Sequence, residues 1–105
     1  MHVFLNQIFT QLPKLQLSNE DLASVYKEWN SSKILLKTGI SNRFIAAEDE
    51  TALDLSITPS KLALDFISNS FKSFDYLIYV SQTNDYLFPG NATLLLNKLM
   101  DPPLH

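Results

Sequence analysis

The chain carries two apolar stretches whose pattern is typical of β-strands. The first lies at residues 2–9, begins with Val3 and Leu5, and ends at Leu12-Pro13, where we expect a turn. The second is the run Tyr76-Leu77-Ile78-Tyr79-Val80, which is rich in β-forming residues and typical of a strand covered on both faces. One strand is therefore predicted near each end of the chain.

Helical spacing follows the first predicted strand. Ser18-Asn19-Glu20-Asp21 approximates a capping box, in which a serine hydroxyl and an acid three residues later satisfy free amides at a helix start. The next apolar residues recur at i, i+3, i+4 and i+7 and share one helix face: Leu22, Val25, Tyr26 and Trp29. Ser31-Ser32 is expected to end this helix. Ile34-Leu35-Leu36 then forms either a short second helix or an extended run.

Two further helices are predicted in the second half of the chain. Glu48-Asp49-Glu50-Thr51 favours a helix start, and the apolar face behind it comprises Leu55, Leu62, Ala63, Phe66 and Ile67. Pro59 lies within this pattern, where it either begins a new helix capped by Thr58 or kinks a longer one. Asn91 is expected to cap the last helix, which carries Leu94, Leu95, Leu96, Leu99 and Met100. Residues 101–105 are expected to form an irregular tail.

The order strand, helices, strand, helix predicts an α/β fold in which a helical crossover joins two parallel strands. At 105 residues the chain fits a single small domain, residues 1–105. Two strands alone leave both outer edges unpaired, and such a pair is marginal in water. The pattern therefore predicts an incomplete sheet that belongs to a larger one.

Composition and charge narrow the class of protein and its partners. Hydrophobic residues make up 46% of the chain and charged residues 18%, which is typical of a globular protein. The net charge of −3 and the lack of a Lys/Arg run argue against a nucleic-acid or anionic-membrane partner. We find no apolar span of transmembrane length, no secretory signal and no cysteine, which together favour a cytoplasmic protein.

Residues 37–47, Lys37-Thr38-Gly39-Ile40-Ser41-Asn42-Arg43-Phe44-Ile45-Ala46-Ala47, carry the most specific local signal. Gly39 is one of two glycines in the chain, and it permits a backbone conformation that other residues avoid. Lys37 and Arg43 fit phosphate binding, or else a surface pair without a ligand. Trp29 fits stacking on a base or a place in the core. The three residues before Pro89 fit an acyl pocket or the packing of their own loop: Tyr86, Leu87 and Phe88.

No catalytic or metal-binding constellation is predicted. The two histidines, His2 and His105, lie at the extreme termini, where a catalytic base is hardest to hold in place. The sequence has no Cys/His metal pattern and no phosphate-loop or dinucleotide glycine motif. We therefore expect no resident metal and no resident cofactor.

Four patches, in order, resemble the N-terminal part of the ketoacyl-acyl-carrier-protein synthase III family, which has the thiolase fold. They span about residues 3–100 and are Ser18-Asn19-Glu20-Asp21-Leu22, Lys37-Thr38-Gly39-Ile40 with Arg43 and Ile45-Ala46-Ala47, Glu50-Thr51-Ala52-Leu53-Asp54-Leu55, and Asp75-Tyr76-Leu77-Ile78-Tyr79-Val80-Ser81-Gln82-Thr83 with Phe88-Pro89 and Asn91-Ala92. The second patch is the most specific, because it is similar to the family's Thr-Gly-Ile and Arg-Ile-Ala segment.

The resemblance implies an activity and a set of site residues. The family condenses an acyl-CoA, a substrate and not a cofactor, with malonyl carried on acyl carrier protein, in fatty-acid or related acyl-chain synthesis. Its cysteine nucleophile takes the acyl group, and a histidine and an asparagine assist the condensation. By resemblance, Lys37, Thr38, Arg43 and Trp29 contact CoA, and Phe88 lines the acyl pocket of a second copy. Acyl-CoA, acyl carrier protein and a homo-oligomer are thus the implied partners.

The chain also departs from the family. Trp29 lies nine residues before Thr38, a longer spacing than the family has, and Pro59 falls inside a family helix. The segments that hold the family's cysteine, histidine and asparagine are missing. We therefore interpret the chain as a truncated or fragmentary synthase III-like protein, less than a third of a complete synthase and inactive alone. The alternative is a non-catalytic α/β interaction module that self-associates through bare strand edges and a leucine-rich last helix.

Overall fold

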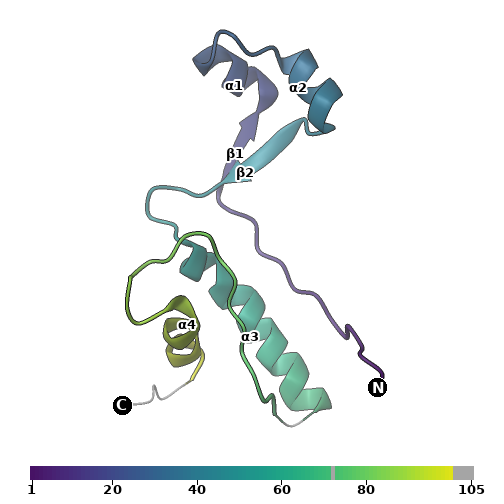
Figure 1. Ribbon diagram of the computed structural model, residues 1–105, viewed down its shortest axis with the longest axis vertical. Coiled ribbons are helices and arrows are strands. Elements are labelled where there is room, and N and C mark those ends of the chain that lie inside the picture. Colours follow the sequence, from purple (N-terminus) through teal and green to yellow (C-terminus); the bar gives the residue numbers. More distant parts are fainter. Residues whose placement is uncertain (72, 101–105) are drawn as a thin grey trace. The chain divides into compact units, whose positions relative to one another are not determined.

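A computed structural model describes residues 1–71 and 73–100 of the chain. These residues form two strands and four helices: β1 (Leu15–Ser18), α1 (Asn19–Val25), α2 (Ser31–Thr38), β2 (Asn42–Ile45), α3 (Ala52–Ser70) and α4 (Asn91–Leu99) (Figure 1). The combination of helices with a two-stranded sheet confirms the predicted α/β class and the predicted number of strands.

The described residues separate into two compact units. The first, called the sheet unit, comprises residues 12–49, and the second, called the helical unit, comprises residues 1–11 and residues from 50 onward. The interpretation of residues 1–105 as a single domain stays a prediction. The irregular tail expected at residues 101–105 lies outside the described residues.

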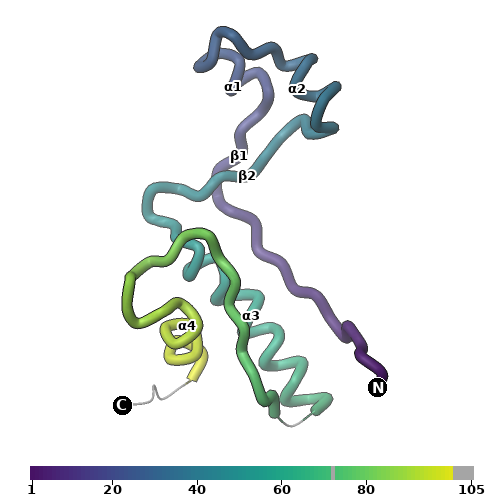
Figure 2. The backbone as a smooth tube through the Cα atoms, in the orientation of Figure 1, coloured from purple at the N-terminus to yellow at the C-terminus, as the bar shows by residue number. Residues whose placement is uncertain are grey.

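The sheet is built from segments other than the predicted ones. β1 pairs with β2 in the antiparallel sense, with Leu15 opposite Ile45 and Ser18 opposite Asn42. The predicted parallel pair of residues 2–9 and 76–80 is therefore wrong, and both segments run as extended chain outside any described strand (Figure 2). A strand forms only where a neighbouring backbone supplies hydrogen bonds, and an apolar run does not reveal where that neighbour is.

Two helices, α1 and α3, start where the sequence predicted capping chemistry. At α1 the Asp21 N–H donates to Ser18 Oγ at 3.0 Å, and the Ser18 N–H donates to the Asp21 carboxylate at 2.9 Å. Thr51 and Asp54 form the same capping box at α3, which confirms the helix start expected after residues 48–51. Pro59 lies inside α3, so the structure adopts the alternative of one longer helix.

Two helix boundaries in the sheet unit differ from the predictions. α1 ends at Val25, so Tyr26 and Trp29 lie beyond it and do not extend its apolar face. Ser31 begins α2 and does not end a helix, because the Asn30 side chain accepts a backbone N–H of the first turn at 3.1 Å and caps a new start. The short second helix that was one alternative for Ile34-Leu35-Leu36 is therefore confirmed, and it begins earlier than expected, at Ser31.

The helical unit has a small core where α3 and α4 pack together. Its buried apolar side chains, among the described residues, are Leu53 of α3 and Leu95 of α4. Asn91, predicted to cap α4, is the first residue of that helix, and Gly90 is the cap. The Asn91 side chain is buried and accepts the Asp85 backbone N–H at 3.2 Å. It thus fastens the preceding loop to the helix start.

Two extended segments of the helical unit leave apolar side chains exposed. The Phe9 ring lies edge-on to the Phe66 ring of α3, with centroids 6.3 Å apart, so the first segment contacts that helix. In the second segment Tyr76, Ile78 and Val80 are 86%, 84% and 90% exposed, while the residues between them are partly buried. This alternation leaves one side of the segment uncovered, as expected for an incomplete sheet.

Candidate functional site

A hollow of about 360 Å³ lies beside α2 in the sheet unit. Its lining comes from α2 and the short connection before it and comprises Glu28, Trp29, Asn30, Lys33, Ile34, Lys37 and Thr38. Lys33 and Lys37 are four positions apart on α2, as are Ile34 and Thr38, so these side chains share one side of the helix. Three of the sequence-predicted residues, Trp29, Lys37 and Thr38, therefore meet in one place.

Trp29 reaches the hollow in spite of its long spacing from Thr38. Its backbone N–H donates to the Tyr26 carbonyl at 2.9 Å, which folds the connection after α1 into a turn. The Trp29 and Tyr26 rings lie with centroids 5.7 Å apart. At 50% exposure the Trp29 side chain is not a core residue, and much of its surface is open to a ligand.

The charged side chains around the hollow favour an anionic ligand. Lys33 and Lys37 bring two ammonium groups, and Glu28 brings one carboxylate. Two positive charges against one negative charge raise the local concentration of anions at a concave surface. The half-exposed indole of Trp29 adds a flat apolar surface on which an aromatic ring can stack.

The turn that follows α2 is fixed by its own backbone and by Thr38. The Gly39 N–H donates to the Leu35 carbonyl at 2.8 Å, and Gly39 has a φ of 70°, which confirms the predicted special conformation. The Thr38 hydroxyl donates to the Ile34 carbonyl at 2.7 Å and accepts the Ile40 N–H at 3.1 Å. The hydroxyl therefore holds the end of the helix as well as lining the hollow.

Arg43 lies on β2 and does not line the hollow. Its Nη2 donates to Asn19 Oδ1 at 2.6 Å, while the buried Nη1 has no hydrogen-bond partner among residues 1–71 and 73–100. Asn19 was not predicted as a site residue, yet it is only 3% exposed. The sequence offered one clue to this role, because Asn19 directly follows the cap residue Ser18. A polar side chain at such a position is buried only when it finds hydrogen-bond partners in another part of the chain.

The remaining predicted residue, Phe88, lies in the helical unit and is 89% exposed. It precedes a cis peptide bond to Pro89 in the loop before α4. Its assignment to an acyl pocket stays a prediction. The part of the chain that the structure describes contains no group of three or more His, Cys, Asp or Glu residues arranged to hold a metal ion.

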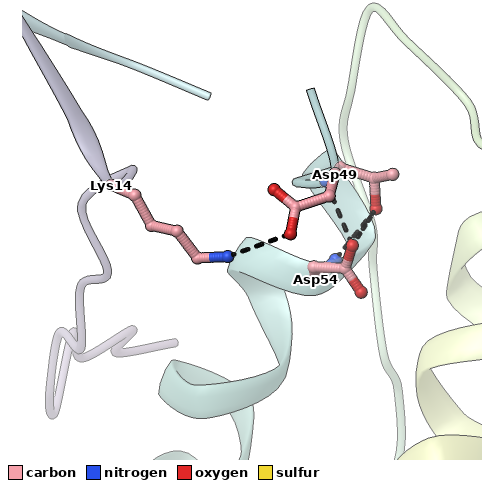
Figure 3. A network of polar contacts seen from close by, with 4 residues as sticks. Lys14, Asp49 and Asp54 are labelled. Atoms are coloured by element: carbon pink, nitrogen blue, oxygen red, sulfur yellow. Dashed lines mark hydrogen bonds and ion pairs between the residues drawn. The ribbon is translucent and has the colours of Figure 1, made fainter. Parts of the chain in front are cut away.

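A surface ion pair joins Lys14 and Asp49 within the sheet unit, with Nζ and Oδ2 3.5 Å apart (Figure 3). The two side chains are 62% and 78% exposed, and pairs of this kind contribute at most about 1 kcal/mol. Figure 3 also shows the carboxylate of Asp54, which accepts hydrogen bonds from the α3 cap residue Thr51. These contacts hold chain segments and helix starts in place and do not form a site.

The sequence relatives and a solved structure point to one family. No protein-family model matches the sequence. The chain is 35% identical to a beta-ketoacyl-[acyl-carrier-protein] synthase III of Ehrlichia ruminantium (strain Welgevonden), with 88% of this chain and 28% of that protein covered. It is 35% identical to the enzyme of the same name from Bartonella bacilliformis, covering 84% and 27%, and 37% identical to that of Neisseria meningitidis serogroup A, also covering 84% and 27%.

A solved structure agrees with the sequence relatives. A crystal structure of a 3-oxoacyl-(acyl-carrier-protein) synthase III matches 89% of this chain and 28% of its own, with a TM-score of 0.60 and 32% identity. The chain therefore spans a little over a quarter of the length of the relatives that it matches. Within residues 1–71 and 73–100, none of the helices combines the length and the apolar character needed to cross a bilayer.

Proposed function

Because the chain belongs to the beta-ketoacyl-[acyl-carrier-protein] synthase III family, of whose members it spans a little over a quarter, we propose that it is the N-terminal part of such a synthase. The parent reaction transfers an acyl group from acyl-CoA and condenses it, with loss of carbon dioxide, with malonyl on acyl carrier protein. This is a step of fatty-acid or related acyl-chain synthesis in the cytoplasm. The names of the relatives support acyl carrier protein as the partner of the complete enzyme.

The part of this reaction that we assign to the chain is binding of the nucleotide end of CoA. The observation that carries the proposal is the meeting of Trp29, Lys37 and Thr38 in one hollow. In this arrangement the Trp29 ring stacks on the adenine, and the Lys37 ammonium pairs with a phosphate. Lys33, four residues before Lys37, adds a second positive charge for the same group of phosphates.

The chemistry of acyl transfer lies outside this chain. None of the 105 residues is a cysteine, so no thiol is present to take the acyl group. We expect intact-mass measurement after incubation with acyl-CoA to detect no stable acyl adduct. A stoichiometric adduct on a serine would contradict the assignment of a binding role without a nucleophile.

The binding proposal is tested through Trp29, the one tryptophan of the chain. Titration with CoA should change its fluorescence saturably, because the adenine covers the exposed ring. Lys37→Ala should weaken binding about tenfold, since it removes a charge-assisted contact. Lys61→Ala, a matched loss of one ammonium in the helical unit, should leave affinity unchanged. A wild-type chain without a fluorescence response, or equal effects of the two substitutions, would refute the proposal.

A second candidate function is self-association, which the exposed apolar side of residues 76–80 favours. We propose that copies of the chain form oligomers through this segment, because unpaired β-forming backbone with bare apolar side chains readily accepts another strand. In sedimentation velocity Ile78→Lys should reduce the oligomer fraction. Leu36→Lys, at a residue of α2 that is 87% exposed, should not. A monodisperse wild-type monomer would exclude this function.

A further inference from the structure

Asn19 is a buried polar side chain that joins the start of α1 to the turn after α2. Its Nδ2 donates to the Ile40 carbonyl at 2.7 Å, and its Oδ1 accepts the Arg43 Nη2 at 2.6 Å. Its backbone N–H donates to the Ser41 carbonyl at 3.1 Å. One residue thus holds two points of the segment between α2 and β2 and one residue of β2, all within the sheet unit.

These bonds act on the same turn that Thr38 and Gly39 fix from the other side. The Ile40 N–H is bound to Thr38 Oγ1, and the Ile40 carbonyl is bound to Asn19. Ile40 is therefore held at both of its backbone polar groups. A helix of eight residues is too short to be stable by itself, so its last turn depends on such external contacts.

The last turn of α2 carries two of the residues that line the hollow, Lys37 and Thr38. We infer that Asn19, which lies outside the hollow, is a positioning residue that keeps this last turn helical and so keeps Lys37 and Thr38 in place. Arg43 completes the arrangement by fixing the Asn19 side chain through a short, charge-assisted bond, and it lies outside the lining of the hollow. The inference rests on the proposed binding of CoA in the hollow.

The two glycines of the chain allow a direct test, because labelling with ¹⁵N-glycine gives two backbone amide signals. Gly39 lies in the turn that Asn19 holds, and Gly90 lies in the helical unit as an internal control. We expect Asn19→Ala to shift or broaden the Gly39 signal and to leave Gly90 unchanged. Affinity for CoA, read from Trp29 fluorescence, should fall about tenfold as the binding-competent fraction falls.

A matched asparagine provides the control variant. The Asn69 side chain donates to the Asp65 carbonyl at 2.8 Å on the exposed surface of α3, so Asn69→Ala also removes one side-chain bond to a carbonyl. It should change neither the Gly39 signal nor the affinity. If Asn69→Ala moves the Gly39 signal as much as Asn19→Ala does, the positioning role is refuted.

Conservative variants separate positioning from folding. Asn19→Asp keeps an acceptor for Arg43 and loses the donor to Ile40, so its affinity should lie between those of wild type and Asn19→Ala. If Asn19→Ala loses its helical circular dichroism signal, the test passes to Arg43→Lys. A Gly39 amide signal that does not move in Arg43→Lys then overturns the inference. If Asn19→Ala binds CoA as tightly as the wild type does, the positioning role alone is refuted. If the wild type does not bind CoA, the proposed function is refuted.

Discussion

The two glycines form a matched pair for testing how the backbone of the turn after α2 stabilises the sheet unit. A Cβ added at either Gly39 or Gly90 would meet no heavy atom within 4 Å, so neither substitution by alanine creates a clash. The two residues differ in backbone conformation, since φ is 70° at Gly39 and −68° at Gly90. The perturbation that we propose is alanine at each position in turn.

The expected cost at Gly39 is conformational. An L-residue in the left-handed region loses roughly 1–2 kcal/mol, while the stiffer unfolded chain returns about 0.4–1 kcal/mol. Gly39→Ala should therefore destabilise the sheet unit by about 1 kcal/mol, or about 4–8 °C in melting temperature for a domain of this size. At Gly90 no strain arises, and the entropic gain offsets the small preference for glycine over alanine at a helix cap, so the net change is near zero.

Urea and thermal unfolding followed by far-ultraviolet circular dichroism measure both changes. Trp29 fluorescence provides a second probe that lies in the same unit as Gly39. Gly39→Asn is the control, because asparagine tolerates the left-handed region and should recover part of the loss. If the two alanine substitutions lower the stability equally, or if Gly39→Ala does not lower it, the argument that the positive φ of residue 39 requires glycine is refuted.

Three further predictions concern the helix cap, the acid response and the core. Thr51→Ala should destabilise α3 by about 1 kcal/mol through loss of its cap, and Thr51→Ser should not, by chemical denaturation. Hydrogen bonds from the Ser18 hydroxyl and backbone N–H lower the pKa of Asp21 below 3.8. The cap therefore stabilises α1 above that pH and loses its effect as pH falls through the lowered value, and Asp21→Asn should flatten this acid limb in a dichroism titration. Leu95→Ala should cost about 2–5 kcal/mol because its side chain is buried, whereas Leu62→Ala, 46% exposed in the native structure, should change the melting temperature little.

The features that the sequence predicted well are those decided within a few residues. The predicted capping box at Ser18 and Asp21 joins groups three positions apart, and the helix start predicted at residues 48–51 is fixed by bonds of the same span between Thr51 and Asp54. The left-handed turn at Gly39 likewise follows from the one residue type that adopts it without strain. Family membership could be read in the same way, because short patches of neighbouring residues carried the resemblance.

The residues that line the hollow were predictable in part. Lys37 was singled out as a base two positions before Gly39, and Thr38 was singled out through the family resemblance. The resemblance also pointed to Trp29, although its spacing from Thr38 argued against it. The structure explains how Trp29 reaches the hollow in spite of this spacing. The turn at Tyr26 and the helix α2 bring Trp29 and Lys37 to the same hollow.

Only the tertiary structure determined the contacts between distant parts of the chain. The pairing of Ser18 with Asn42 in the sheet, and the bonds from Asn19 to Ile40 and Arg43, join residues more than twenty positions apart. The strongly apolar segments 2–9 and 76–80 stay outside the described sheet, while two shorter and more polar segments form it. Local sequence sets which residues cap, turn or prefer extended chain, but a β-ladder or a buried amide needs a partner, and only the folded chain determines where that partner lies.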